Sequence, residues 1–454
     1  MRGSLLLAVF LSLGALVSAA ERPNIILIFA DDLGYGDLGC YGGEVRTPGL
    51  DRLAEDGYRS TDCLVAASVC GPSRAALMTG RYPMRCGHPI SRHATPKYAQ
   101  YGIDPEEVTM AEQLKKAGYA THLVGKWHLG LEVEGSHPLD AGFDSYYGIS
   151  GNPGSGHPLM RDRAVADEKV PGDKIAGLYT EEAVKLIMED RSQPFFLYLA
   201  HHIAHLPLVP SAEFRGRSGK DVYADFVLEL DDSVARIRQA VEAKGLAEET
   251  LIVFLSDNGP AYPGSAAPLS GGKYVTMEGG MRVPAIFHWP GRIPRGQVSD
   301  ALITSMDLFP LFSALAKVPL PEGVTLDGRN IIELLEGRTQ ESPHRHFLYY
   351  NGLNLQAVRD ERWKLHFPRS LDDQPYWAKR AGANRKKIHL KLEEPLLFDL
   401  VADRGEKRNV YSRYPEVVSQ LNKIAAKARL EIGDVDQTGS DQRPHGLIQP
   451  NLKN

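Results

Sequence analysis

The sequence predicts an α/β protein: a large, mostly parallel sheet flanked by helices, followed by a smaller C-terminal subdomain with an antiparallel sheet and a helix. Continuous apolar and β-branched runs, such as residues 24–30 and 251–255, alternate with helical stretches. This pattern is typical of strands buried on both faces of a parallel sheet. Beyond about residue 341 the apolar runs become short and are separated by turns, which is typical of an antiparallel sheet.

The chain has 454 residues, enough for a large core and two structural units. We expect a signal peptide over residues 1–20, a main α/β domain over 22–340, and a C-terminal subdomain with a polar tail over 341–454. The net charge of −5 provides no global basic field, so we expect no nucleic-acid partner.

The N-terminus has the three features of a secretory signal. Arg2 provides the positive start, residues 5–17 are nearly all apolar, and residues 17–20 are small enough for cleavage. The apolar run is shorter than the roughly 20 residues that span a bilayer, and no later stretch is longer. We therefore expect an exported protein without a membrane anchor.

The first predicted strand, residues 24–30, runs directly into Asp31 and Asp32. Two adjacent carboxylates at the end of a buried strand repel each other unless a cation lies beside them. A hard divalent cation with oxygen ligands would remove this repulsion. On this motif alone, a solvated turn is an equal alternative, because Asp and Gly are common in turns.

Two short helices are predicted from the capping and stop residues at their ends. Residues 47–57 form one, with Thr47 as its cap and Gly57 as its stop. Thr109 and Glu112 have the spacing of a capping box, which predicts that a second helix begins there.

Cys70 stands before Gly-Pro-Ser and a helical stretch. The N-terminus of a helix favours a thiolate or another anion, and Arg74 adds a full positive charge one turn on. These features indicate an activated nucleophile. The alternative is a buried structural cysteine, since free cysteine is among the most buried residue types.

A second strand over residues 120–124 leads to Lys126 and His128, which are flanked by glycines. Their functional interpretation is an anion clamp and a proton-transfer group. The alternative is a lysine that keeps its ammonium in solvent and a hydrogen-bonded structural histidine.

A third strand over residues 195–200 is followed by His201, His202 and His205. Three histidines in five residues suggest zinc, but zinc requires further ligands at characteristic spacing, and these are not evident. We therefore favour a catalytic acid role for one of them.

A long amphipathic helix over residues 222–244 precedes the fourth strand, 251–255. That strand ends in Asp257 and Asn258, again with oxygen ligands at a strand terminus. A glycine-rich loop then carries Lys273.

Polar clusters thus follow four buried strands that are separated by helices. Ligands of open α/β sheets bind outside the carboxyl ends of the strands. The sequence therefore predicts that these side chains form one site: Asp31, Asp32, Lys126, His128, His205, Asp257 and Asn258.

From residue 24 to about residue 409 the chain resembles a type I sulfatase of the alkaline phosphatase-like superfamily, near the arylsulfatase A and N-acetylgalactosamine-6-sulfatase group. The stretch Cys-Gly-Pro-Ser-Arg followed by Ala-Ala-Leu-Met-Thr-Gly carries the resemblance most strongly. The matching runs, in chain order, are 31–37, 70–80, 125–130, 202–207, 256–259 and 272–282.

The resemblance implies that a maturation enzyme oxidises Cys70 to Cα-formylglycine. One hydroxyl of the hydrated aldehyde would attack sulfur and expel the alcohol, leaving a sulfated enzyme. The second hydroxyl would lose its proton, and sulfate would depart. The implied Ca²⁺ ligands are Asp31, Asp32, Asp257 and Asn258, with residue 70 also touching the metal.

The resemblance also implies a role for each remaining motif residue. Arg74 would hold the diol, and Lys126 and Lys273 would bind the sulfate oxygens. His128 would be the base that triggers sulfate elimination, and His205 the acid that protonates the leaving oxygen. Asn152 and His202 are assigned to substrate binding.

The implied function is that of an exported sulfatase acting on a sulfated carbohydrate, where the substrate class rests on analogy at the level of the fold. The alternatives are a phosphodiesterase or phosphonate monoester hydrolase of the same superfamily, and a non-catalytic glycan-binding relative. Substrate choice is expected to depend on two predicted loops, residues 88–101 and 151–171.

The chain lacks any Asn-x-Ser/Thr sequon, whereas animal lysosomal sulfatases are glycoproteins. This favours a bacterial protein that is periplasmic or extracellular. If Cys70 is modified, Cys40, Cys63 and Cys86 remain, and at most one disulfide can form among them.

Overall fold

The computed structural model describes residues 22–91, 101–131, 134–151, 157–370 and 391–444. The predicted signal peptide and Asn152 lie outside these residues.

The main sheet has 11 strands. Its centre has the order β9 (Arg282–His288), β8 (Thr250–Ser256), β1 (Asn24–Ala30), β7 (Phe195–Ala200) and β3 (Ala120–Gly125). The last four of these run parallel, and β9 is antiparallel to β8. The prediction of a large, mostly parallel sheet is confirmed, and four carboxyl ends lie at one edge.

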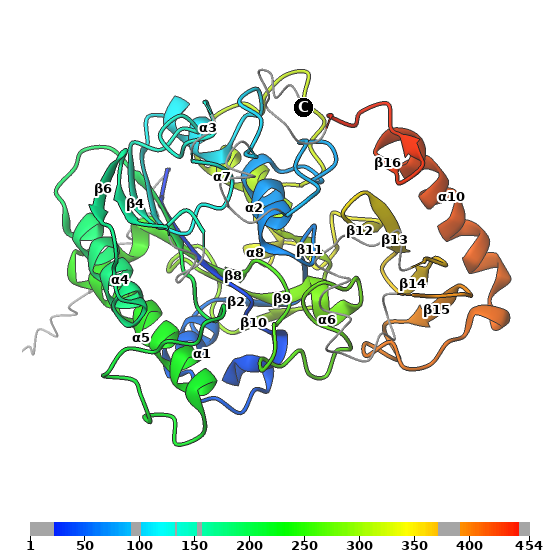
Figure 1. Cartoon of the computed structure of the whole chain (residues 1–454), viewed down its shortest axis with the longest axis horizontal. Helices are drawn as coiled ribbons and strands as arrows, with labels where there is room; N and C mark the ends of the chain where they lie inside the picture. The colour runs from blue at the N-terminus through cyan, green and yellow to red at the C-terminus, as the bar shows by residue number, and fades with distance from the viewer. Residues whose placement is uncertain (1–21, 92–100, 132–133, 152–156, 371–390, 445–454) are drawn as a thin grey trace, which may run out of the picture.

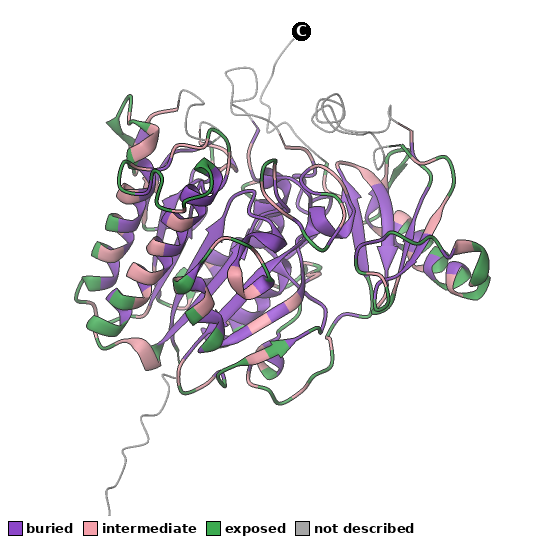
Figure 2. Cartoon of the chain, turned by 90° about the horizontal axis from the view of Figure 1, so that it is seen from below, coloured by how far each residue is buried: buried purple, intermediate pink, exposed green. Residues whose placement is uncertain are grey.

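Helices cover both faces of this sheet (Figure 1). One layer contains α1 (Pro48–Glu55), α4 (Gly172–Met188) and α5 (Val222–Ala243), and the other contains α2 (Cys70–Thr79), α3 (Met110–Lys116) and α7 (Leu308–Leu315). Successive side chains of a strand point to opposite faces. Ile25, Leu27 and Phe29 therefore pack in one core cluster, and their neighbours in β1 pack in the other. Figure 2 shows the strands buried between the helices.

Two local predictions are wrong. Residues 151–171 are not entirely loop, because β5 (Leu159–Arg161) and β6 (Ala164–Asp167) form a hairpin at the sheet edge. All of β6 is exposed, so it lacks the apolar pattern by which buried strands are recognised. Thr47 stands at the N-cap position of α1 as predicted, but its side chain makes no capping hydrogen bond; its hydroxyl accepts the Gly39 N–H at 2.9 Å. The capping box of Thr109 and Glu112 is confirmed.

The C-terminal unit is an antiparallel sheet of β12 (Phe347–Asn351), β13 (Asn354–Arg359), β14 (Trp363–His366) and β15 (Leu396–Asp399). Helix α10 (Pro415–Glu431) lies at the outer edge of the molecule, at the right of Figure 1. The predicted antiparallel sheet with one helix is therefore confirmed. Among the described residues, the remaining strands and α-helices are β2 (Tyr58–Leu64), β4 (Ser145–Gly148), α6 (Glu278–Met281), β10 (Gln297–Ser299), β11 (Ile303–Thr304), α8 (Ile332–Leu335), β16 (Gly433–Asp434) and β17 (Gln437–Thr438).

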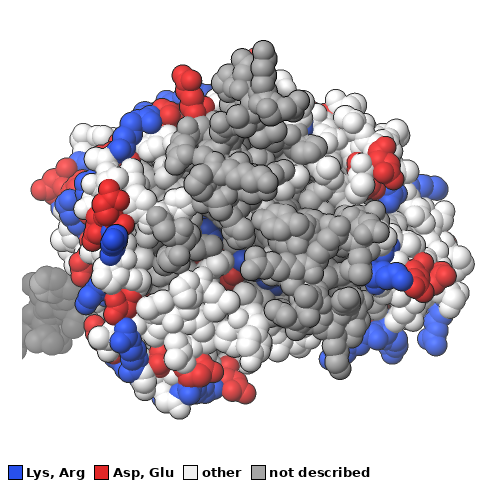
Figure 3. Space-filling model, in the orientation of Figure 1, with Lys and Arg blue, Asp and Glu red and all other residues white. Residues whose placement is uncertain are grey.

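Acidic and basic side chains are interspersed along the left edge of the face shown in Figure 3. Among the described residues, no helix has both the length and the apolarity to cross a membrane. All four cysteines are free in the structure.

Candidate active site

The carboxyl edge of the main sheet gathers the polar residues that follow its central strands. Asp31 and Asp32 follow β1, Lys126 follows β3, and Asp257 follows β8. Because β1 lies between β7 and β8, its two aspartates are central to the group, and His205 arrives from the loop after β7. The structure thus brings together side chains from six separate stretches of the sequence, the last two being α2 and the loop that carries Lys273.

Three buried cations neutralise three buried carboxylates. Lys126 Nζ donates to Asp31 Oδ2 at 2.6 Å, and Lys273 Nζ donates to Asp32 Oδ2 at 2.6 Å. Arg74 Nη2 donates to Asp257 Oδ2 at 2.8 Å. The aspartates repel one another when ionised, and these pairs offset much of that repulsion.

The carboxylates respond differently to this environment. Burial raises the pKa of Asp31, but Lys126, His205 and Arg74 outweigh burial and hold that pKa well below its usual range. For Asp257, burial and the neighbouring Asp31 charge outweigh Arg74 and raise the pKa to about 7. A pKa near 7 means that Asp257 ionises less readily than an ordinary aspartate, so a further positive charge beside it would stabilise its carboxylate form.

Arg74 is held rigidly at the base of the site. Its Nε and Nη2 both donate to Asp257 Oδ2, its Nη1 donates to the Lys126 carbonyl at 3.1 Å, and its guanidinium lies 5.3 Å from the centre of the Phe29 ring. The side chain is completely buried. These contacts prevent Arg74 from turning toward solvent.

Cys70, the first residue of α2, points into the carboxylate group. Its Sγ lies 3.3 Å from Asp31 Oδ1, 3.8 Å from Asp32 Oδ1 and 3.5 Å from Lys273 Nζ. Burial, followed by the charges of Asp257 and Asp31, raises the pKa of the Cys70 thiol well above its usual value. The helix terminus and Arg74 therefore do not produce a stable thiolate, contrary to the first interpretation of this motif.

The donor atoms fit a hard divalent cation. Ligand atoms of Asp31, Asp32, Cys70 and His205 all lie within 4.8 Å of one another. Asn258 Nδ2 donates to Asp32 Oδ1 at 2.8 Å, whereas its Oδ1 is buried without a hydrogen-bond partner in the described part of the chain. A buried carbonyl without a partner is costly, and a cation would satisfy it. This oxygen-rich set matches the ligands that Ca²⁺ prefers.

His128 has a positive φ of 61° and is fixed by its N–H, which donates to the Ser150 carbonyl at 2.8 Å. Burial, Lys126 and Arg74 hold the pKa of His128 well below its usual value. The imidazole is therefore neutral at physiological pH, and its Nδ1 is buried without a hydrogen-bond partner among the described residues.

His205 is the more open of the two histidines, and its Nε2 lies 3.6 Å from Asp32 Oδ2. Its Nδ1 is 2.5 Å from the Leu206 carbonyl. Because a carbonyl only accepts, Nδ1 carries a hydrogen. Burial and Lys273 lower the pKa of His205, while Asp32 and Asp31 act in the opposite direction.

His202 does not lie among these polar groups. Its ring packs 5.5 Å from the Phe226 ring and 5.8 Å from the Tyr179 ring, measured between centroids. The residue is buried, and neither ring nitrogen has a hydrogen-bond partner among the described residues. Its placement in the core against α4 and α5 favours the shaping of the site over substrate contact.

The sequence did not reveal the residues that support the segment of Lys273. Lys364 and Glu406 are fully or nearly fully buried and contact the segment that carries this lysine. They are far from it in the sequence and have no recognisable local spacing. Only the docking of the C-terminal sheet brings them there.

Comparison with known proteins identifies the family. The family model "Sulfatase" matches residues 23–318, and the model "C-terminal region of aryl-sulfatase" matches residues 342–452. The chain is 38% identical to human arylsulfatase A, over 93% of this chain and 91% of that protein. It is 36% identical to rat N-acetylgalactosamine-6-sulfatase, over 97% and 94%.

Solved structures agree with this result. The crystal structure of Ps i-CgsB in complex with k-i-k-neocarrahexaose superposes with a TM-score of 0.79 at 30% identity, covering 93% of this chain and 94% of that one. A structure from a study of glycosaminoglycan metabolism by Bacteroides thetaiotaomicron (BT33336S-sulf) also has a TM-score of 0.79 and 30% identity, covering 90% of this chain and 100% of that one.

The fold and the family matches define a sulfuric ester hydrolase. More specifically, the chain belongs to the type I sulfatase family. The comparisons give no support to the phosphodiesterase alternative.

Proposed function

We propose that this sulfatase hydrolyses sulfate esters of a carbohydrate, with residue 70 as a formylglycine and Ca²⁺ as the metal. The observation that carries the proposal is the position of Cys70 Sγ, 3.3 Å from Asp31 Oδ1 and 3.5 Å from Lys273 Nζ. This atom stands where the oxygen of an oxidised residue would stand. Its raised pKa argues that the thiol itself is not the nucleophile.

As a hydrated aldehyde, residue 70 would supply one hydroxyl to attack sulfur and a second whose deprotonation would release sulfate. Lys273 contacts Cys70 Sγ directly, and Lys126 contacts Asp31, which itself contacts that sulfur; both lysines are suited to bind the sulfate oxygens, where negative charge grows during the reaction. Arg74 keeps its charge near residue 70 because Asp257 and Phe29 hold it. Asp31, Asp32, Asp257 and Asn258 would hold Ca²⁺.

The two histidines divide the proton transfers. Neutral His128 is suited to accept the proton of the second hydroxyl. His205 already carries a hydrogen on Nδ1, so donation from Nε2 requires a second proton on the ring. Burial lowers the pKa of His205 overall, although Asp32 and Asp31 favour the protonated form, so the protonated ring is a stronger acid than an exposed imidazolium. His205 is therefore suited to protonate the leaving oxygen.

The proposed substrate class rests on the relatives. One is named N-acetylgalactosamine-6-sulfatase, and one solved relative holds k-i-k-neocarrahexaose. We further propose export by residues 1–20, a periplasmic or extracellular location in a bacterium, a catalytic domain over 22–340 and a C-terminal subdomain over 341–454. The maturation enzyme that modifies Cys70 is the proposed protein partner.

The test combines mass spectrometry with a substrate panel. The protein is produced with a formylglycine-generating enzyme, and the mass of the peptide that contains Cys70 is measured. We expect conversion of the thiol to an aldehyde, sulfate release from sulfated mono- or oligosaccharides, and no release by Cys70→Ala. Full activity of an unmodified protein would contradict the mechanism, and a higher kcat/KM for an aryl phosphodiester than for an aryl sulfate would contradict the reaction.

A further inference from the structure

The segment 270–278, which carries Lys273, has little regular secondary structure and is held in place by contacts with other parts of the chain. Lys273 N–H donates to the Pro260 carbonyl at 2.9 Å, and Tyr274 N–H donates to the Ser68 carbonyl at 2.9 Å. These bonds tie the segment to the main domain near residue 70. Further contacts come from the C-terminal unit.

Lys364 of β14 provides the central contact. Its Nζ donates to the Thr276 carbonyl at 2.8 Å and to Glu278 Oε1 at 3.0 Å, and it lies 3.0 Å from Glu406 Oε1. The Lys364 side chain is completely buried. One ammonium group thus places three hydrogen-bond donors on fixed acceptors, two of which belong to the segment.

Glu406 closes the network from the other side. Its Oε2 accepts the Glu278 N–H at 2.6 Å, and its Oε1 lies 2.7 Å from His366 Nε2. A carboxylate that accepts the first N–H of α6 also stabilises the start of that helix. Glu406 therefore determines where the segment ends and the helix begins.

Side chains of β12 and β13 add further contacts. Asn351 Nδ2 donates to the Tyr274 carbonyl at 3.0 Å, and the Thr276 hydroxyl donates to Gln356 Oε1 at 2.8 Å. The C-terminal unit thus contacts both residues that flank Val275, within three positions of Lys273.

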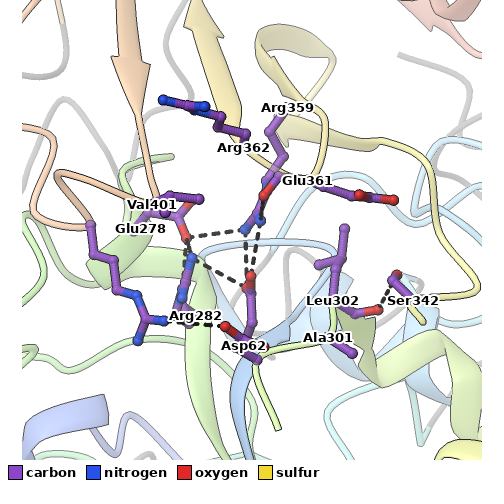
Figure 4. A network of polar contacts seen from close by, with 12 residues as sticks. Asp62, Glu278, Arg282, Ala301, Leu302, Ser342, Arg359, Glu361, Arg362 and Val401 are labelled. Carbon is purple, nitrogen blue, oxygen red and sulfur yellow. Dashed lines mark hydrogen bonds and ion pairs between the residues drawn. The ribbon is translucent and has the colours of Figure 1, made fainter. Parts of the chain in front are cut away.

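Glu278 is also fixed on its main-domain side. Figure 4 shows Glu278 with Arg282, and Asp62 between Arg282 and Arg359. Arg282 Nε donates to Glu278 Oε2 at 2.7 Å, and Arg359 pairs with Asp62 at 2.9 Å. The Arg359–Asp62 pair joins the two units, whereas the Arg282–Glu278 pair lies within the main domain. Neither pair hydrogen-bonds to the backbone of the segment, whereas Lys364 and Glu406 do.

We propose that Lys364, with Glu406, is a positioning residue: it holds segment 270–278 so that the Lys273 ammonium reaches Asp32 and residue 70. The inference rests on the proposed role of Lys273 in binding sulfate. In this view the C-terminal unit contributes to the reaction of the main domain, by positioning Lys273, as well as to the stability of the fold.

The test is a double-mutant cycle on the mature enzyme with an aryl sulfate. We expect Lys364→Met to lower kcat/KM by about 10- to 100-fold and to raise the inhibition constant of inorganic sulfate. In a Lys273→Met background the same substitution should change kcat/KM by less than about 2-fold, because the group that it positions is absent. Arg362→Met is the matched control, since Arg362 is exposed in the turn between β13 and β14 and pairs with Asp399.

Thr276→Val is the second variant, because removal of a buried lysine can prevent folding. It removes only the hydroxyl contact with Gln356 and should lower kcat/KM by about 3- to 10-fold. In the Lys273→Met background this effect should likewise disappear. Equal losses in both backgrounds would overturn the positioning role and leave the role of Lys273 intact. An unchanged Lys273→Met would overturn both.

Discussion

Lys126 Nζ donates a 2.6 Å hydrogen bond to Asp31 Oδ2, although β7 lies between the strands that carry these two residues. Both side chains are buried, and Lys126 is a principal reason that the pKa of Asp31 is held low. The contact is possible because both residues stand just beyond the carboxyl ends of parallel strands.

Lys126→Met removes this charge with little change in side-chain volume. We expect kcat/KM for an aryl sulfate to fall by about 10²- to 10³-fold, because a preorganised cation near the developing negative charge is lost. Steady-state kinetics check the value. Lys116→Met, at the end of α3, is the control and should retain full activity. A loss below threefold in Lys126→Met would contradict the proposed role.

Ca²⁺ should stabilise the fold as well as support turnover. The buried carboxylates and Asn258 Oδ1, which has no hydrogen-bond partner among the described residues, would give the folded state an affinity for the ion that the unfolded chain lacks. At an ion concentration 100 times Kd, the stabilisation is about 2.7 kcal/mol.

The measurement is the melting temperature of the protein after treatment with a chelator, with and without added Ca²⁺. Asn258→Leu should weaken the response, whereas Asn330→Leu, outside the site, should not. A melting temperature that is independent of Ca²⁺ in the wild-type protein would count against a calcium site.

His205→Gln should affect substrates according to their leaving groups. A nitrophenolate leaves without protonation, so hydrolysis of its sulfate should fall by less than about 10-fold. A sugar alkoxide requires a proton, so release from a sulfated sugar should fall by about 10²- to 10⁴-fold. Rates on the two substrates check this. Equal losses would assign His205 to sulfate binding instead of acid catalysis.

Acid should destabilise the protein through His201. Burial lowers the pKa of His201 to about 4, below the ordinary value of 6.5. The unfolded chain therefore binds more protons between these values, and stability is lost as the pH falls from about 6.5 to about 4. This histidine alone contributes up to about 3 kcal/mol of that loss.

Urea denaturation of wild type and His201→Gln at several pH values checks this prediction. The free energy of unfolding should fall less steeply with acidification in the variant. His157→Gln is the control, because His157 lies outside the buried core. Parallel curves for His201→Gln and wild type would show that His201 does not titrate in this way.

The sequence by itself determined the strands that build the centre of the sheet and the residues that follow them. Long apolar runs, the capping box of Thr109 and the Asp31-Asp32 pair are local patterns, and local patterns are readable without the fold. The parallel arrangement then requires that the groups at the strand ends meet. This is why most of the candidate site could be predicted.

Tertiary structure alone decided how those groups pair and what surrounds them. It placed His202 in the core, paired Lys126 with Asp31, and put Lys364 and Glu406 behind the segment of Lys273. Each of these outcomes depends on contacts between residues distant in the chain. The electrostatic environment of a side chain depends on burial and on nearby charges, and local spacing specifies neither.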